Sequence, residues 1–294
     1  MRSKSFGEIK NISKHFTKKE SLEMFKKMCI SRNFEFNTKD AFDKGYIKMP
    51  IYLSVGEESV SSAISIAYKK PHIFAQHRCH DIYLAFGGEI VPLIDELLHK
   101  PSGIAKGMGG SASIHSPKIG MFGHSGLMGD QIPIAVGYAL GSKQKVLAIM
   151  GDASAEEDYV ISSMGYAASK KLPVLFVCTD NGLSILTKVA VRRNWSMVNV
   201  AKAFGMDAVE ITDDPWLIMH HVKKLAKNLP SFINIHTTRV LWHNGTGQDS
   251  EPEWDRFKIV KEDLKNLGLE KQALKIEQET KEFIDKLWKK QLKK

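Results

Sequence analysis

Two short apolar runs, Val146-Leu-Ala-Ile-Met-Gly-Asp152 and Val174-Leu-Phe-Val-Cys-Thr-Asp-Asn181, decide the predicted fold. Each opens with five consecutive apolar residues, which is typical of a parallel strand buried on both faces. Between them, residues 155–171 have the composition and length of a crossover helix. A third apolar run, Phe232–His236, follows a helical stretch over residues 215–229. This alternation predicts an α/β fold with a central parallel sheet flanked by helices.

Helical segments extend this predicted sheet at both ends of the chain. Residues 18–36 carry apolar side chains at the spacing of one helix face, and the tail from Glu253 is charged and helical in pattern. We therefore expect an N-terminal helical segment over residues 1–50, an α/β domain over 51–250 and a C-terminal helical tail over 251–294.

Two internal segments complete this outline. Residues 56–68 predict a helix, because acidic Glu57 and Glu58 suit the positive end of the helix dipole. Residues 87–129 are so rich in Gly and Ser that we expect loops there rather than regular elements.

The composition indicates a globular, water-soluble protein. Of the 294 residues, 43% are hydrophobic and 26% charged, which is ordinary for this class. No apolar run reaches the roughly 18 to 20 residues that cross a bilayer, and the basic N-terminus lacks the apolar stretch of a secretion signal. The cysteines, Cys29, Cys79 and Cys178, are too widely spaced for a paired framework or a metal motif. We expect a cytoplasmic protein with no membrane partner.

The net charge of +9 raises the question of nucleic-acid binding. Much of the excess lies near the chain ends, as in Lys289-Lys290 and Lys293-Lys294. No recognition helix, RNA-binding sheet motif or zinc finger accompanies it. We therefore interpret it as a solvated basic surface that favours anionic substrates, and expect no nucleic-acid partner.

Polar side chains follow both central strands, at the edge where parallel sheets bind ligands. Asp152 and Asn181 stand 29 positions apart (181 − 152), each just after an apolar run. A carboxylate and an amide oxygen, with a backbone carbonyl, suit Mg²⁺, and a following helix would direct N–H groups at a diphosphate. Each piece alone is a common turn or helix cap. Together at matched strand ends, they favour a site.

The same residues resemble a thiamine diphosphate fingerprint, Gly-Asp-Gly followed one strand later by Asn-Asn. The stretch Gly151-Asp-Ala-Ser-Ala-Glu and the stretch Lys171-Leu-Pro-Val-Leu-Phe-Val-Cys-Thr-Asp-Asn-Gly-Leu183 are similar to the alpha subunits of two-chain 2-oxo acid dehydrogenases of the pyruvate, branched-chain and acetoin types. The resemblance implies a diphosphate-binding α/β domain. It also implies Mg²⁺ ligation by the side chains of Asp152 and Asn181 and the carbonyl of Leu183, with the diphosphate meeting the backbone of Ala153 and Ser154.

Further motifs extend the resemblance over roughly residues 20–250. Leu53-Ser-Val-Gly-Glu-Glu-Ser59 is similar to the family's Gly-Gln-Glu-Ala helix start, and Lys106-Gly-Met-Gly-Gly-Ser111 to a Gly-rich loop. The remaining motifs imply site residues. Gln76-His-Arg-Cys-His80 implies that His77 and Arg78 contact the diphosphate, and Gly126-Leu-Met-Gly-Asp-Gln-Ile-Pro133 implies that Gly126 and Met128 contact the aminopyrimidine. Thr238-Arg-Val-Leu-Trp-His243 implies that His243 is catalytic. His80 is expected to be a structural or supporting residue.

Several positions depart from the family pattern. Ala153 replaces a glycine but is still small, and Asp180 replaces the first Asn, adding negative charge near the metal. Ser113 stands where the family usually has His, and Ser162 where many relatives have Glu. Residues 187–196, in a loop that helps to cover the substrate, show little of the usual pattern. Cofactor binding is therefore expected, whereas the substrate is not defined.

The resemblance also implies a partner. In this family the glutamate that activates the aminopyrimidine comes from a second, pyrimidine-binding domain, and this chain shows only one α/β domain. We expect a beta-type subunit in an α2β2 assembly, with a lipoyl acyltransferase as a candidate acceptor, and negligible turnover by the chain alone.

Other functions remain open at this stage. Within the same cofactor class, the chain could be half of a split transketolase or a biosynthetic enzyme that transfers an acyl or ketol unit. A non-catalytic interaction protein is disfavoured by the intact Asp152, Asn181 and Arg78. A nucleotide-binding α/β protein is disfavoured because no Walker or Gly-x-Gly-x-x-Gly element follows a strand. The expected activity is decarboxylation of a 2-oxo acid and transfer of the acyl unit.

Overall fold

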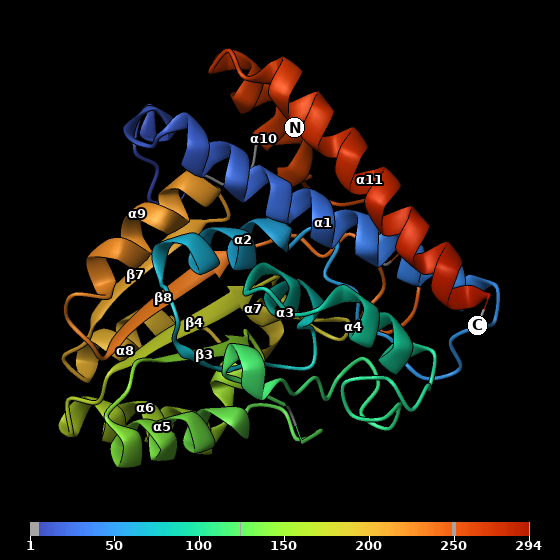
Figure 1. The fold of residues 1–294 in the computed structure, drawn as a ribbon. Coiled ribbons are helices and arrows are strands. Elements are labelled where there is room, and N and C mark those ends of the chain that lie inside the picture. The colour runs from blue at the N-terminus through green and yellow to red at the C-terminus, as the bar shows by residue number, and fades with distance from the viewer. Residues whose placement is uncertain (1–5, 124, 249–250, 294) are drawn as a thin grey trace.

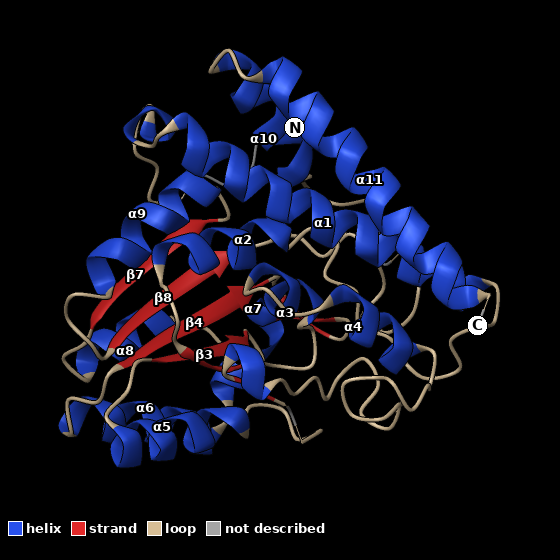
Figure 2. Ribbon diagram, in the orientation of Figure 1, coloured by secondary structure: helices blue, strands red, loops and turns tan. Residues whose placement is uncertain are grey.

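The computed structural model describes residues 6–123, 125–248 and 251–293, and its centre is one parallel sheet. Within these residues six strands pair in the order β2-β1-β3-β4-β8-β7, all parallel. Figure 2 shows the sheet in red between helical layers, which confirms the predicted fold class. The strands are β1 (His72–Phe74), β2 (Met121–Phe122), β3 (Val146–Gly151), β4 (Val174–Asp180), β7 (Asp207–Thr212) and β8 (Ser231–His236).

The two apolar runs form the neighbouring central strands β3 and β4. They pair in parallel register, with Gly151 opposite Thr179 at the carboxyl ends. Successive side chains point to opposite faces of the sheet. Leu147 accordingly belongs to one hydrophobic cluster and Ala148 to the other. Burial on both faces explains why these strands are continuously apolar.

Helices cover both faces of the sheet. The cluster on one face includes buried side chains from α5 (Gln131–Ser142), α6 (Asp158–Ser169) and α8 (Met197–Ala203). The other face is covered by α2 (Glu58–Ala67) and α9 (Pro215–Leu225), which contact each other. Figure 1 shows α5 and α6 below the sheet and α2 and α9 above it. The expected helices at α2, α6 and α9 are confirmed, each slightly shorter than predicted.

A second layer of helices lies outside α2. It consists of α1 (Lys18–Asp43), α10 (Arg256–Asn266) and α11 (Glu270–Leu292), and α1 and α11 run side by side (Figure 1). The rings of Phe34 on α1 and Trp288 on α11 lie 5.7 Å apart and are buried. The predicted terminal helices are therefore present, and α1 continues seven residues beyond the expected end at Phe36 (43 − 36).

Polar contacts fix where the outer layer begins and how it is attached. Thr17 and Glu20 form a reciprocal capping box at the start of α1, in which each side chain accepts the other's backbone N–H. Buried Arg32 lies 2.5 Å from Glu58 at the start of α2 and 3.0 Å from Asp255 before α10. A buried charge needs such partners, so this pair of carboxylates specifies how α1, α2 and α10 meet.

One predicted loop region contains a helix. Within residues 87–129, α4 (Ile90–Leu97) buries Leu93 and Leu97, and its Pro92 lies in the first turn, where proline is tolerated. The surrounding glycines concealed this short amphipathic element. The remaining short elements are 3₁₀ turns η1 (Ile12–His15), η2 (Pro117–Ile119) and η3 (Ser154–Glu156), helices α3 (His80–Ala85) and α7 (Val189–Arg192), and the hairpin strands β5 (Leu183–Ser184) and β6 (Thr187–Lys188).

The terminal helices share one hydrophobic cluster with the sheet. Met28 of α1, Ile64 of α2 and Trp288 of α11 all belong to it. The proposed division of the chain at residues 50 and 250 stays a prediction. In the described ranges, no helix combines the length and apolarity that a bilayer crossing requires.

Candidate functional site

A cavity of about 280 Å³ opens at the carboxyl ends of β1, β3 and β4. β1 and β3 lie side by side in the sheet. The strand that follows β1 in the sequence, β2, pairs with the far side of β1, whereas the strand that follows β3, β4, pairs with the far side of β3. Such a reversal leaves a crevice in which α/β proteins bind ligands. The cavity is lined by Gln76, His77, Arg78, Met128, Gly151, Asp152, Ala153, Ser154, Asn181, Leu183, Ser184, Ile185, Arg239 and His243.

Asp152 supplies a buried carboxylate at the end of β3. The preceding Gly151 leaves room for the side chain of Gln76, whose Oε1 would lie 2.9 Å from a Cβ at this position. Burial, reinforced by the charge of Asp180, raises the pKa of Asp152 to about 7, although Arg192 acts in the opposite direction. Only 2% of Asp152 is exposed. A carboxylate in this environment needs a cation.

Asn181 is held in one orientation by a neighbouring carboxylate. Its Nδ2 donates to Glu57 Oε1 (3.0 Å), and its Oδ1 accepts from the backbone N–H of Leu183 (3.2 Å). An ionised carboxylate accepts hydrogen bonds and donates none. The side-chain nitrogen of Asn181 must therefore face Glu57, and its side-chain oxygen faces away from Glu57. The turn is completed by Gly182, whose φ of +75° favours glycine.

The strand-end oxygens fit the ligand chemistry of Mg²⁺. Asp152 contributes a carboxylate, Asn181 an amide oxygen and Leu183 a backbone carbonyl, all from residues that line the cavity. Hard divalent cations prefer such oxygens. Across the described ranges, no group of three or more His, Cys, Asp or Glu side chains is arranged for a metal. A cation here would therefore use this mixed set and complete its shell with ligand and water oxygens.

Arg78 brings a fixed positive charge to the cavity. It is 4% exposed and donates to the carbonyls of Leu53 (2.5 Å) and His243 (3.2 Å), while its Nε lies 4.0 Å from Glu57 Oε1. Burial lowers the pKa of Arg78, partly offset by Glu57, but a guanidinium remains protonated. Arg78 can therefore neutralise an anion in the cavity and also anchor the loop that carries His243.

The imidazole of His243 lies in an aromatic and cationic corner. Its ring is 5.5 Å from the ring of His77 and 5.6 Å from that of Tyr52. Its Nδ1 lies 3.5 Å from Arg239 Nη1, and Arg239 Nη2 donates to the carbonyl of Ile185 (2.8 Å). The spacing from Arg239 to His243 thus brings both side chains to the cavity, as the sequence indicated.

The segment after Asp152 differs from the expected helix. A 3₁₀ turn, Ser154–Glu156, comes first, and α6 begins only at Asp158. The helix expected over residues 155–171 therefore begins three residues later than predicted. Glu157 has extended backbone angles and separates the turn from the helix. The N–H groups nearest the cavity belong to a tight turn, in which the small Ala153 permits a close approach.

Gly126 is the one expected site residue that does not line the cavity. It lies in an exposed bend, whereas Met128 two residues later reaches the lining and its carbonyl accepts from Tyr159 Oη. His80 also lies elsewhere, as expected for a structural residue. It is fully buried, with Nδ1 3.0 Å from Glu35 and Nε2 2.9 Å from Ser111.

Asp180, the acidic departure from the family pattern, points away from the cavity. Its carboxylate accepts from the N–H of Gly182 (3.0 Å) and from Asn234 Nδ2 (3.0 Å), and it lies 3.6 Å from His236 Nδ1. Its charge is still felt at Asp152, whose pKa it raises. Asp180 therefore holds the turn after β4 through contacts outside the cavity lining.

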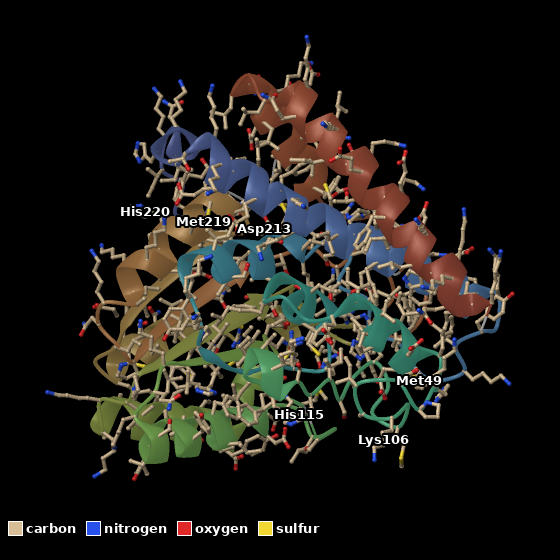
Figure 3. The ribbon with its side chains drawn as sticks, viewed as in Figure 1. Met49, Lys106, His115, Asp213, Met219 and His220 are labelled. Carbon is tan, nitrogen blue, oxygen red and sulfur yellow. The ribbon has the colours of Figure 1, made fainter. Side chains whose placement is uncertain are left out.

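The Gly-rich loop over residues 105–111 is organised by a carboxylate outside the cavity. Both oxygens of buried Glu96 accept backbone N–H groups, from Ala105 and Gly107 on one side and Gly109 and Gly110 on the other. Figure 3 shows Lys106 near Met49 at one edge of the molecule, with His220 at the opposite edge. Gly107 is needed here, because its φ is +77° and a Cβ would lie 2.5 Å from the backbone of His99.

Two charged residues at the site were missed by the sequence analysis. Glu57 lies in a quoted motif but was interpreted only as a helix start. Arg192, on α7, donates from Nη2 to Asp152 Oδ2 (2.5 Å) and contacts Glu156 (3.0 Å). No spacing rule could have paired residues 40 positions apart across a hairpin.

Comparisons with known proteins agree with this geometry. A family model described as dehydrogenase E1 component matches residues 26–290. The pyruvate dehydrogenase E1 component subunit alpha of Zymomonas mobilis is 29% identical over 67% of this chain and 58% of that protein. The mitochondrial one of Chaetomium thermophilum is 31% identical over 59% and 43%. This chain thus spans about half the length of these two relatives.

A longer alignment joins it to the mitochondrial subunit alpha of Solanum tuberosum, 26% identical over 91% of this chain and 74% of that protein. Among solved structures, transketolase from Campylobacter jejuni superposes with a TM-score of 0.60 at 15% identity. It covers 95% of this chain and 49% of the transketolase chain. At that identity the likeness concerns the fold alone.

Proposed function

The chain belongs to the dehydrogenase E1 component family, and from this premise we propose that it is the alpha-type subunit of a thiamine diphosphate- and Mg²⁺-dependent enzyme. The proposed reaction is decarboxylation of a 2-oxo acid with transfer of the acyl unit. The observation that carries this proposal is that Asp152, Asn181 and Leu183 line one cavity together with Arg78.

The proposed division of labour follows from charge and geometry. Asp152, Asn181 and Leu183 hold Mg²⁺, and Arg78 with His77 neutralises the diphosphate. The turn at Ala153 and Ser154 receives the diphosphate, and Met128 lies on the aminopyrimidine side; Gly126 contributes only through the loop that leads to Met128. Bound thiamine diphosphate supplies a nucleophilic carbon and accepts the electron pair released by decarboxylation.

We assign proton exchange with the substrate to the imidazole of His243. Histidine transfers protons near neutral pH because its unperturbed pKa lies there. Nη1 of the neighbouring Arg239 lies 3.5 Å from Nδ1 of His243. The guanidinium of Arg239 is suited to attract a carboxylate substrate.

We infer that a beta-type subunit completes the site. Apolar side chains are exposed near the cavity: Leu127 at 60%, Ile185 at 57% and Leu186 at 54%. Exposed apolar groups around a cavity are typical of a surface that a partner covers. The aminopyrimidine-activating glutamate would come from that partner, in an α2β2 assembly with a lipoyl acyltransferase as a candidate acceptor. The three free, buried cysteines suit a reducing, cytoplasmic location.

The experiment is titration of thiamine diphosphate with Mg²⁺ into the chain, alone and with a candidate beta-type subunit, followed by turnover of 2-oxo acids. We expect binding that requires Mg²⁺ and turnover only in the mixture. Robust turnover by the chain alone would contradict the partner. Absence of Mg²⁺-dependent binding in the mixture would contradict the cofactor site.

A further inference from the structure

The guanidinium of Arg192 contacts the carboxylate of Asp152, the proposed metal ligand. Nη2 is 2.5 Å from Asp152 Oδ2, and the Arg192 and Asp152 side chains are only 13% and 3% exposed. Its other N–H groups are also used: Nε lies 3.2 Å from Glu156 Oε2, and Nη1 donates to the carbonyl of Thr187 (2.8 Å). Arg192 is therefore a tightly held internal cation.

The contact between Arg192 and Asp152 opposes the binding of a divalent metal ion to Asp152. Asp152 is the single carboxylate in the oxygen set of Asp152, Asn181 and Leu183. A Mg²⁺ ion bound to it at about 2.1 Å would face a guanidinium in contact with the same group. Two like charges in a poorly hydrated site repel strongly.

We propose that Arg192 is a stand-in cation, which neutralises Asp152 before the metal arrives and which Mg²⁺ displaces. The inference rests on the proposed function, because it takes Asp152 to be the metal ligand. In the metal-free chain the pair avoids a buried, uncompensated carboxylate. Metal binding then exchanges one cation for another, and the affinity for Mg²⁺ is lower than the oxygen set alone would give.

Glu156 provides a position for the displaced guanidinium. It already contacts both Nε and Nη2 of Arg192 (3.2 and 3.0 Å), so Arg192 keeps a carboxylate partner after leaving Asp152. The other cation nearby, Arg193, lies 3.4 Å from Glu156 through Nε and stacks over Trp195 (5.0 Å). No contact joins Arg193 to Asp152 in the described structure, which makes it a matched control.

The displacement also reaches the segment expected to cover the substrate. Arg192 ends α7 within residues 187–196, and its side chain attaches this segment to the strand-end turn. When Mg²⁺ takes Asp152, the segment keeps its attachment to Glu156 and loses the one to Asp152. Loading the metal is thereby linked to how firmly the segment is held.

The test is competition measured without turnover. Mn²⁺ is titrated into the full chain, mixed with its proposed beta-type partner and thiamine diphosphate, and free Mn²⁺ is followed by electron paramagnetic resonance. We expect Arg192→Gln to bind Mn²⁺ on the order of tenfold more tightly than the parent, within the range of typical coupling between sites. Arg193→Gln removes the same charge from the same segment and should stay within about twofold, because it lacks the contact with Asp152.

A second variant covers the case in which Arg192→Gln does not fold. Lysine keeps the charge but cannot bridge two carboxylates as the planar guanidinium does, so Arg192→Lys should bind Mn²⁺ several-fold more tightly than the parent. Weaker binding by either variant would show that Arg192 positions Asp152 and stays in place, which overturns the inference. Equal effects of Arg192→Gln and Arg193→Gln would overturn it as well. If the parent binds no Mn²⁺ with thiamine diphosphate, the proposed function fails instead.

Discussion

The strand-end turns and the residues that reach the cavity from outside the sheet are held in different ways. Asp152 and Asn181 leave neighbouring strands whose register is fixed over six residue pairs. Glu57, Arg192 and His243 come instead from a helix start, a short helix and a loop, and their positions depend on charges and hydrogen bonds to distant residues. The strand-end part is suited to hold the cofactor, and the outer part to adjust and use it.

The largest expected effect tests the strand-end part. Asp152→Ala removes the only carboxylate of the proposed metal set, and we expect Mg²⁺-dependent binding of thiamine diphosphate to weaken by roughly a thousandfold or more, since neutral oxygens bind Mg²⁺ poorly. Calorimetric titration measures this. Asp158→Ala is the matched control, because Asp158 is exposed at the start of α6 and does not line the cavity. Near-normal binding by Asp152→Ala would place the metal elsewhere.

The strand-end turns could be predicted from the sequence, whereas the charge contacts of the residues outside the sheet could not. β3, β4 and the turns after them follow from apolar runs and polar strand ends, which are local patterns. β1 has only three residues, and β7, at the sheet edge, is interrupted by polar Glu210, so neither forms a continuous apolar run. The contacts of Arg192 with Asp152 and of Glu57 with Asn181 join positions 40 and 124 residues apart. Long-range charge pairing of this kind leaves no spacing signal.

A second, smaller effect should separate use of the cofactor from its binding. We expect His243→Ala to lower turnover of the assembled enzyme on the order of a hundredfold, as loss of a general acid–base group does, with cofactor affinity within about twofold. Steady-state kinetics and calorimetry on one preparation measure both. His220→Ala, on α9 and outside the residues that line the cavity, should change neither. A matching loss of affinity in His243→Ala would mean that His243 belongs to the binding part.

The smallest expected effect concerns Glu57. This residue lies outside the strand-end turns and yet should affect metal binding, so it tests how separate the two parts of the site are. Its carboxylate accepts from Asn181 Nδ2 and so keeps the amide oxygen free to be the proposed metal ligand. Without this acceptor the amide can rotate and present its nitrogen to the cation. Supporting residues of this kind typically change metal affinity 10- to 100-fold, and we expect Glu57→Leu to weaken Mn²⁺ binding about tenfold.

The conservative variant decides whether orientation is the cause. Glu57→Gln keeps an oxygen that can accept from Asn181, so it should bind Mn²⁺ within about threefold of the parent if the hydrogen bond matters. If Glu57→Gln loses as much affinity as Glu57→Leu, the negative charge beside Arg78 is what counts, and Glu57 acts through electrostatics rather than through Asn181. Near-parental binding by Glu57→Gln would show that Glu57 acts on the proposed metal site through its hydrogen bond with Asn181. Equal losses in both variants would leave the orientation of Asn181 to its own turn, and the strand ends would then hold the metal without outside help.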